Sequence, residues 1–150
     1  MKVYLDTCVW CRPFDYPSKR VASESAAFAG VLRKADRGDL EIVGSAALLA
    51  EIDFISLQEK REAVRALIRK SCSKILKIDG ETVTLAEKIM EECRLSAMDA
   101  IHVATASKHA DVFVTVDDEI LKKSDCLKKF IEVKSVVDLE VQYGEPRSND

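Results

Sequence analysis

Four acidic residues occupy positions from which they could meet at one edge of a folded chain. Asp6 and Asp117 each follow a short apolar run, and Asp99 begins a helix-like segment. Glu51 lies about two turns into another such segment. Carboxylates brought together with no lysine or arginine among them repel one another, and a divalent cation removes that repulsion. Because hard oxygen ligands suit Mg²⁺ or Mn²⁺, the pattern predicts a carboxylate metal site.

Three of these acids also have an ordinary structural explanation. Asp6 is suited to an Asx-turn or a helix cap. Asp99 closes an S-x-x-D capping box, which accounts for it without any ligand. Asp117 is suited to begin the next helix, a task that Asp118 or Thr115 could share. Capping and metal binding therefore both remain open for each of these acids.

Glu51 needs a different explanation, because its neighbours three and four positions away are apolar. A carboxylate on such a face is costly unless it meets a cation or a metal ion. An ion pair with an arginine is the structural alternative. Asp53 has similarly apolar neighbours, so spacing alone does not choose between these two acids.

The elements that must position these acids alternate between strands and helices. This alternation predicts a parallel α/β sheet, at whose carboxyl edge strands end and helices begin. Ligands of open α/β sheets bind at that edge. The expected strands are Lys2–Leu5, Leu40–Val43 (stopped by Gly44), Lys74–Ile78, Val112–Val116 and Phe130–Val133.

The intervening segments are expected to be mostly helical. Prolines at 13 and 17 predict an irregular loop over residues 7–18. Ser18 or Ser23 caps the next helix, which ends near Gly38, and Ser45 caps an apolar helix over residues 46–57. Further helices are expected at residues 58–72, 81–93, the segment that Asp99 opens, 117–124 and 135–141.

Length and composition are those of one globular domain. The chain has 150 residues, is 47% hydrophobic and carries a net charge of -3. This charge excludes a globally basic nucleic-acid binder but not a local basic patch. The apolar runs are far shorter than a ~20-residue membrane span. Without a signal peptide or a regular cysteine framework, we expect a cytoplasmic protein with one domain over 1–141 and a disordered tail over 142–150.

Two other chemistries that use acids at a sheet edge are not supported. A receiver-like signalling domain needs an acidic pair after its first strand, where Asp6 is followed by Thr7 and Cys8. A phosphatase with an aspartyl nucleophile needs D-x-D at the same place, which is absent. No set of histidines and cysteines has zinc spacing.

Cys8 and Cys11 form a C-x-x-C motif that could suggest disulfide exchange. Such sites lie at a helix N-terminus. Pro13 and the loop composition predict that no helix starts here, which favours packing of Trp10 or a chance pair of thiols.

Two further features are candidates for weaker roles. His102 lies one turn after Asp99, where core packing or capping is favoured over support of a ligand. Arg61, Arg65 and Arg69 recur on one side of a helix. Such a stripe could follow an RNA backbone, although a solvated face paired with nearby acids is the favoured interpretation. With Arg12, these arginines are the candidate substrate-binding residues.

The motifs that carry these acids resemble those of PIN-domain nucleases, which include the VapC toxins of toxin–antitoxin pairs. VYLDTCVW with RPFD resembles the first family motif, and Ser45 followed by Glu51 resembles the second. MDAIHVATA resembles the third, and VTVDDEIL the fourth. The match runs from Lys2 to about Val133, and it prefers Glu51 over Asp53. Cys8 departs from the serine or asparagine that is more usual at its position.

The resemblance implies a three-layer α/β/α fold with a five-stranded parallel sheet, one or two Mg²⁺ or Mn²⁺ ions, and hydrolysis of RNA to 5′-phosphate and 3′-hydroxyl products. It further implies a homodimer and a small antitoxin partner. A non-catalytic module that binds RNA or protein is the alternative. The residues it assigns are Asp6, Glu51, Asp99 and Asp117 as catalytic metal ligands, with Thr7, Thr115 and Asp118 in support.

Overall fold

The computed structural model describes residues 1–142, which form a five-stranded parallel sheet in the order β3-β2-β1-β4-β5. The strands are β1 (Lys2–Leu5), β2 (Glu41–Ser45), β3 (Lys74–Leu76), β4 (Val112–Thr115) and β5 (Glu132–Ser135). Consecutive strands are neighbours except where the chain passes from β3 to β4. There it returns across the sheet and pairs with β1, Val3 lying opposite Val112. Such a reversal in strand order is a topological switch point.

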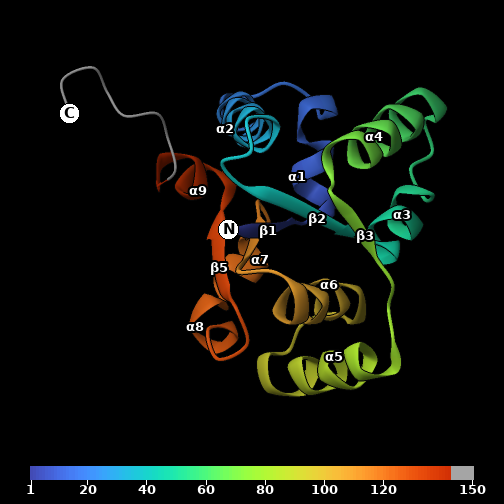
Figure 1. The fold of residues 1–150 in the computed structure, drawn as a ribbon, viewed down its shortest axis with the longest axis vertical. Helices are drawn as coiled ribbons and strands as arrows, with labels where there is room; N and C mark the ends of the chain where they lie inside the picture. The colour runs from blue at the N-terminus through green and yellow to red at the C-terminus, as the bar shows by residue number, and fades with distance from the viewer. Residues whose placement is uncertain (143–150) are drawn as a thin grey trace.

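Helices cover both faces of this sheet and make three layers (Figure 1). α1, α2, α4 and α9 lie on one face, where α2 packs against α9 and α4 against α1. α5 and α6 cover the other face and pack closely against each other. The bounds are α1 (Thr7–Cys11), η1 (Arg12–Phe14), α2 (Lys19–Asp36), α3 (Ala46–Ile52), α4 (Gln58–Ser71), α5 (Gly80–Cys93), α6 (Ala97–His109), α7 (Asp118–Leu121), α8 (Ser124–Leu127) and α9 (Val136–Gln142).

The predicted α/β fold with a five-stranded parallel sheet is confirmed, as are three helix caps. Ser18, Ser45 and Ser96 each accept a hydrogen bond from a backbone N–H in the first turn of the helix that follows. Of the tail predicted for residues 142–150, only Gln142 is described, at the end of α9, and the rest lies outside the described residues. The single-domain assignment stays a prediction.

The largest error concerns residues 7–18, which were expected to be an irregular loop. Asp6 instead caps helix α1, and η1 follows with Pro13 in its first turn, where a missing N–H costs nothing. The fully buried Trp10 anchors α1, because its indole N–H donates to the Leu5 carbonyl at 3.0 Å and its ring meets Phe28 edge-on. Tertiary packing thus stabilises a helix that the local composition disfavours.

Gly44 was expected to stop the second strand, yet β2 continues through it to Ser45. A β-carbon at Gly44 would lie 2.9 Å from the Cys72 sulfur and 3.2 Å from a methyl carbon of Ile75. Glycine therefore fits here because the Cys72 and Ile75 side chains occupy the space beside it, and not because a turn needs it. The following helix is also shorter than expected, since α3 ends at Ile52.

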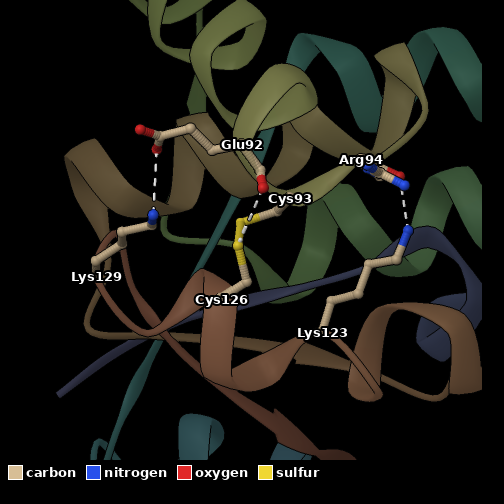
Figure 2. Close-up of a disulfide and its surroundings, with 6 residues drawn as sticks. All are labelled: Glu92, Cys93, Arg94, Lys123, Cys126 and Lys129. Atoms are coloured by element: carbon tan, nitrogen blue, oxygen red, sulfur yellow. Dashed lines mark hydrogen bonds and ion pairs between the residues drawn. A yellow bond between two sulfur atoms is a disulfide. The ribbon is translucent and has the colours of Figure 1, made fainter.

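A disulfide between Cys93 and Cys126 joins the end of α5 to α8 (Figure 2). Lys123 donates to the Arg94 carbonyl at 2.6 Å, and Lys129 forms an ion pair with Glu92 at 3.5 Å. Sequence spacing gave no sign of this pairing, because its cysteines are 33 positions apart in different elements. The bond fixes the segment between β4 and β5 to the helix layer.

Candidate active site

Asp6 lies at the switch point, directly after central strand β1. Its backbone N–H donates to the Val114 carbonyl of β4 at 2.8 Å. Its Oδ1 accepts from the Thr7 backbone N–H at 2.9 Å, and its Oδ2 accepts from the Thr115 hydroxyl at 2.8 Å. The Cys8 thiol also donates to Oδ2, at 3.3 Å. Asp6 is only 5% exposed, so this carboxylate is held in place from several sides.

Glu51 reaches the same region from the last turn of α3. One of its oxygens, Oε1, accepts from the ring Nε2 of His102 at 2.9 Å. The Thr7 hydroxyl donates to the same oxygen. Because Thr7 is bonded through its backbone to Asp6 and through its side chain to Glu51, it links two of the four acids directly. Asp53, the competing acid, instead pairs with Arg65 on the protein surface.

Asp99 and Asp117 complete the set at the starts of two helices. Asp99 lies in the first turn of α6, where its backbone N–H donates to the Ser96 cap at 3.3 Å. Asp117 follows β4 and caps α7 through the Glu119 N–H at 2.9 Å. Its own N–H donates to the Thr115 hydroxyl at 3.0 Å. Thr115 thus supports Asp117 through the backbone and Asp6 through the side chain, and capping accounts for part of each acid's geometry.

The electrostatics of the site indicate that these carboxylates act on one another. Burial raises the pKa of Asp6, and Glu51 adds to this effect, whereas His102 opposes it. Burial also raises the pKa of Asp99, and the negative charges of Asp6 and Asp117 raise it further. The hydrogen bond from His102 lowers the pKa of Glu51. The ionised forms of Asp6 and Asp99 are therefore disfavoured in the metal-free protein.

The chemistry of this donor set fits a hard divalent cation, because it consists of carboxylate oxygens whose mutual repulsion a cation would relieve. The side chains as they lie are not yet gathered around one point. Within residues 1–142, no three histidine, cysteine, aspartate or glutamate side chains are close enough together to hold one ion. The hydrogen bonds that occupy Asp6 and Glu51 are consistent with this spread.

Asp118, the third supporting residue, turns away from the other acids. Both of its oxygens accept from the Arg20 guanidinium, at 2.8 and 2.9 Å, and Arg20 also donates to the Val116 carbonyl at 2.8 Å. This arginine lowers the pKa of Asp118. Arg20 was not singled out from the sequence, since Val116 and Asp118 lie nearly 100 positions away, although it also pairs with Glu24 on the same helix. It ties α2 to the start of α7, next to Asp117.

The candidate substrate-binding arginines are mostly engaged within the protein. Arg12 forms ion pairs with Asp15 and Glu24 at 3.0 Å. Arg61 donates to the Ile55 carbonyl at 2.8 Å, and Arg65 pairs with Asp53. Arg69 is exposed in the last turn of α4, away from the acids. A role for these arginines in binding substrate stays a prediction.

The C-x-x-C motif lies in α1, contrary to the expectation that no helix begins there. Cys8 and Cys11 are free thiols. Burial raises the pKa of both, and the Asp6 carboxylate raises that of Cys8 further. A reactive redox thiol needs the opposite shift. Disulfide exchange at Cys8 and Cys11 is therefore disfavoured by the raised thiol pKa values, and not by the absence of a helix, which was the reason expected from the sequence.

Sequence reasoning underestimated His102 and missed Tyr4. His102 is fully buried, as core packing predicts, but it also bonds directly to Glu51. Tyr4 bonds to the other ring nitrogen of His102 from within β1. The spacing of Asp99 and His102 on one helix was a usable signal, whereas nothing in the KVYL strand marks its tyrosine as more than core.

Comparisons with known proteins bear on the family and the fold of this chain. Residues 3–125 match the sequence profile of the PIN domain. The solved structure of FitAcB from Neisseria gonorrhoeae is 19% identical with a TM-score of 0.59, covering 89% of this chain and 97% of that one. No curated protein sequence matches the chain.

Two further solved structures share the fold. VapBC2 from Rickettsia felis, bound to a DNA fragment from their promoter, is 12% identical with a TM-score of 0.63, covering 90% of this chain and 98% of that one. VapC20 from Mycobacterium tuberculosis, described as a sarcin–ricin loop cleaving toxin, is 14% identical with a TM-score of 0.61, covering 88% and 98%. At such identities the likeness establishes the fold.

Proposed function

This chain belongs to the PIN domain family, and on that premise we propose that it is a Mg²⁺- or Mn²⁺-dependent endoribonuclease. Asp6, Glu51, Asp99 and Asp117 would hold the metal, and RNA phosphodiesters would be hydrolysed to 5′-phosphate and 3′-hydroxyl products. The observation that carries the proposal is the mutual electrostatic effect of these acids at the β1–β4 switch point. Burial raises the pKa of Asp99, and the charges of Asp6 and Asp117 raise it further although Asp99 comes from the opposite helix layer.

The proposed chemistry divides between the metal and the protein. A bound Mg²⁺ or Mn²⁺ supplies charge neutralisation at the scissile phosphate, a lowered pKa for water and stabilisation of the leaving oxygen. Thr7 and Thr115 orient Glu51 and Asp6 by hydrogen bonds and so hold both carboxylates at the same edge of the sheet. No side chain has to act as a nucleophile, and the raised pKa of the Cys8 thiol suits it to remain a protonated donor to Asp6.

We extend the proposal to partners. Two of the solved structures with this fold carry VapBC or VapC names, and one of them is described as a sarcin–ricin loop cleaving toxin. We therefore propose a toxin role, with a homodimer as the active form and a small antitoxin as its inhibitor. Expression of the wild type should arrest bacterial growth, whereas Asp6→Asn should not.

One observation favours a second candidate, a PIN module that binds RNA or protein without cutting. Within the described residues the acids are not arranged to hold an ion as they lie. Such a module would bind its partner equally well with or without Mn²⁺ and would show no metal-dependent cleavage.

The deciding experiment is cleavage of a fluorescent single-stranded RNA with Mn²⁺, with EDTA, and by the double variant Asp6→Asn/Asp117→Asn. Asparagine keeps a side-chain oxygen that can accept the capping bonds of both positions, so the fold should survive. Cleavage that requires both metal and acids supports the nuclease. Equal cleavage by the double variant indicates a contaminating nuclease. A wild type that binds the RNA but does not cleave it favours the binding module.

The four candidate arginines enter the same assay as a weaker part of the proposal. If Arg69 contacts the RNA backbone, Arg69→Gln should weaken RNA binding and reduce its salt dependence. An unchanged RNA-binding constant would mean that Arg69 does not contact the RNA and is simply a solvent-exposed residue of α4.

A further inference from the structure

A continuous chain of polar groups crosses the interior and ends on Glu51. The Ser45 hydroxyl lies 2.6 Å from the Tyr4 hydroxyl, which lies 2.7 Å from Nδ1 of His102. The other ring nitrogen, Nε2, lies 2.9 Å from Oε1 of Glu51. Ser45, Tyr4 and His102 are all 0% exposed. Buried polar side chains in such a chain have no water to replace a lost partner.

The protons of this chain can be assigned from its two ends. The Glu51 carboxylate can only accept a hydrogen bond, so Nε2 must carry the proton that Oε1 receives. Nδ1 is then the acceptor for the Tyr4 hydroxyl. A phenol such as Tyr4 keeps its proton at neutral pH, and Tyr4 is fully buried. The Tyr4 oxygen accepts from Ser45, whose own oxygen accepts from the Leu48 N–H at 3.3 Å.

If the hydrogen bonds between His102, Tyr4 and Ser45 ran in the opposite direction, one donor would be left without an acceptor. If Nδ1 carried a proton and donated to Tyr4, the Tyr4 hydroxyl would have to donate to Ser45. The Ser45 proton would then have no acceptor among the contacts of the described residues. A buried unsatisfied hydroxyl costs roughly 1–3 kcal/mol. Ser45, the N-cap of α3, therefore donates to Tyr4, Tyr4 donates to His102, and His102 donates to Glu51.

This chain determines which oxygen of Glu51 is occupied. Oε1 receives two donors, the His102 ring and the Thr7 hydroxyl. Oε2 receives none of the hydrogen bonds described for residues 1–142. We propose that Tyr4 and His102 are positioning residues that fix Glu51 through Oε1 and reserve Oε2 as its metal-binding oxygen. The inference rests on the proposed metal-dependent function.

Tyr4→Phe is the most selective change, because it removes one oxygen and keeps the ring that packs against Phe113 at 5.9 Å between centroids. Without the Tyr4 donor, Nδ1 of His102 has no hydrogen-bond partner among the described residues, although Nε2 still donates to Glu51. The ring loses the contact that fixes its orientation, so Glu51 Oε1 is held less firmly. Loss of such supporting contacts typically costs 10–100-fold in metal affinity.

The first test needs no metal. The chain has 2 histidines, so ¹⁵N NMR of the imidazoles is simple to assign, with the exposed His109 as internal reference. In the metal-free wild type, His102 should show a protonated Nε2 and a hydrogen-bonded, unprotonated Nδ1. In Tyr4→Phe, Nε2 should stay protonated, and the Nδ1 signal should shift to that of a nitrogen without a hydrogen bond. An unchanged His102 spectrum in Tyr4→Phe would overturn the inference.

The second test is Mn²⁺ titration calorimetry. Tyr4→Phe should weaken binding about tenfold, and His102→Leu should weaken it more. His102→Gln retains an N–H near the position of Nε2 and should recover part of the affinity. Thr82→Val is the control, since it removes a buried hydroxyl that bonds to Asp79 on α5, outside the site, and should leave affinity unchanged.

The outcomes separate the inference from the function. Wild-type affinity in Tyr4→Phe contradicts the positioning role and leaves the nuclease proposal standing. Equal loss in Thr82→Val shows a general effect of destabilisation and also contradicts it. A wild type that binds no Mn²⁺ contradicts both.

Discussion

Asp99 illustrates how a candidate metal ligand makes the metal-free protein less stable. Burial and the charges of Asp6 and Asp117 raise its pKa above the ordinary value of 3.8. Between these two pKa values the folded state binds more protons than the unfolded state. The stability of the metal-free protein therefore falls as pH rises through this window. The residue is kept at a position where its charge is unfavourable unless a cation is present.

Asp99→Asn should consequently stabilise the metal-free protein while abolishing its function. We expect a rise in Tm of about 2 °C at neutral pH, absent well below pH 3.8, where the aspartate is protonated in both states. Mn²⁺-dependent cleavage should fall by at least roughly a hundredfold. Thermal denaturation across pH and an RNA cleavage assay measure the two effects.

Asp36→Asn is the matched control, because Asp36 is exposed on α2 away from the site. Asp36→Asn should change neither the Tm nor the rate of Mn²⁺-dependent cleavage. A lower Tm in Asp99→Asn, or full cleavage at saturating Mn²⁺, would contradict the assignment of Asp99.

At the scale of elements, α1 and the α5–α8 disulfide hold the two segments that bear Asp6 and Asp117. α1 is stabilised by Trp10 from within the core. The segment from α7 to α8 has only short helices, and Cys126 fastens it to Cys93 (Figure 2). Two basic residues, Lys123 and Lys129, lie at the C-terminal end of α5, where they complement the helix dipole.

Opening this disulfide should lower stability, since it closes a loop over 33 positions. Chain entropy predicts a loss of about 3–4 kcal/mol, or roughly 10 °C in Tm. Dithiothreitol should lower the Tm of the oxidised wild type by this amount and leave Cys126→Ser unaffected. Cys72→Ser, which alters a free thiol, should keep the response to reductant. A wild-type Tm that ignores dithiothreitol would contradict the pairing.

At the scale of the whole molecule, strand order decides what the carboxyl edge can bind. Receiver-like domains have the doubly wound order 2-1-3-4-5, whereas this sheet runs 3-2-1-4-5 and reverses between β1 and β4. Asp6 and Asp117 follow the two strands at that reversal. None of the described helices is long and apolar enough to cross a membrane.

Because the candidate ligands come from both helix layers and two adjacent strands, metal binding should stabilise the whole fold. At a Mn²⁺ concentration of 100 times Kd, mass action predicts about 2.7 kcal/mol, or roughly 5–10 °C in Tm. EDTA should reverse the shift. Asp6→Asn/Asp117→Asn should show little of it, and an equal shift in that variant would place the metal elsewhere.

The sequence by itself determined the parts of this protein that depend on local patterns. Alternating apolar strands and capped helices predicted the parallel sheet, and the position of each acid within its element predicted the shared edge. The errors at residues 7–18 and at Gly44 arose where local composition opposed the packing. In the first case the packing of Trp10 stabilises a helix, and in the second β2 continues through a glycine against which the Cys72 and Ile75 side chains pack.

Only the tertiary structure decided which distant groups meet. Tyr4 and His102, Arg20 and Asp118, and Cys93 and Cys126 are each far apart in the sequence. Their contacts depend on strand order, register and helix rotation, which no local pattern encodes. The sequence could therefore name the acids of the candidate site, whereas the groups that hold and orient them became visible only once the sheet had brought its strands side by side.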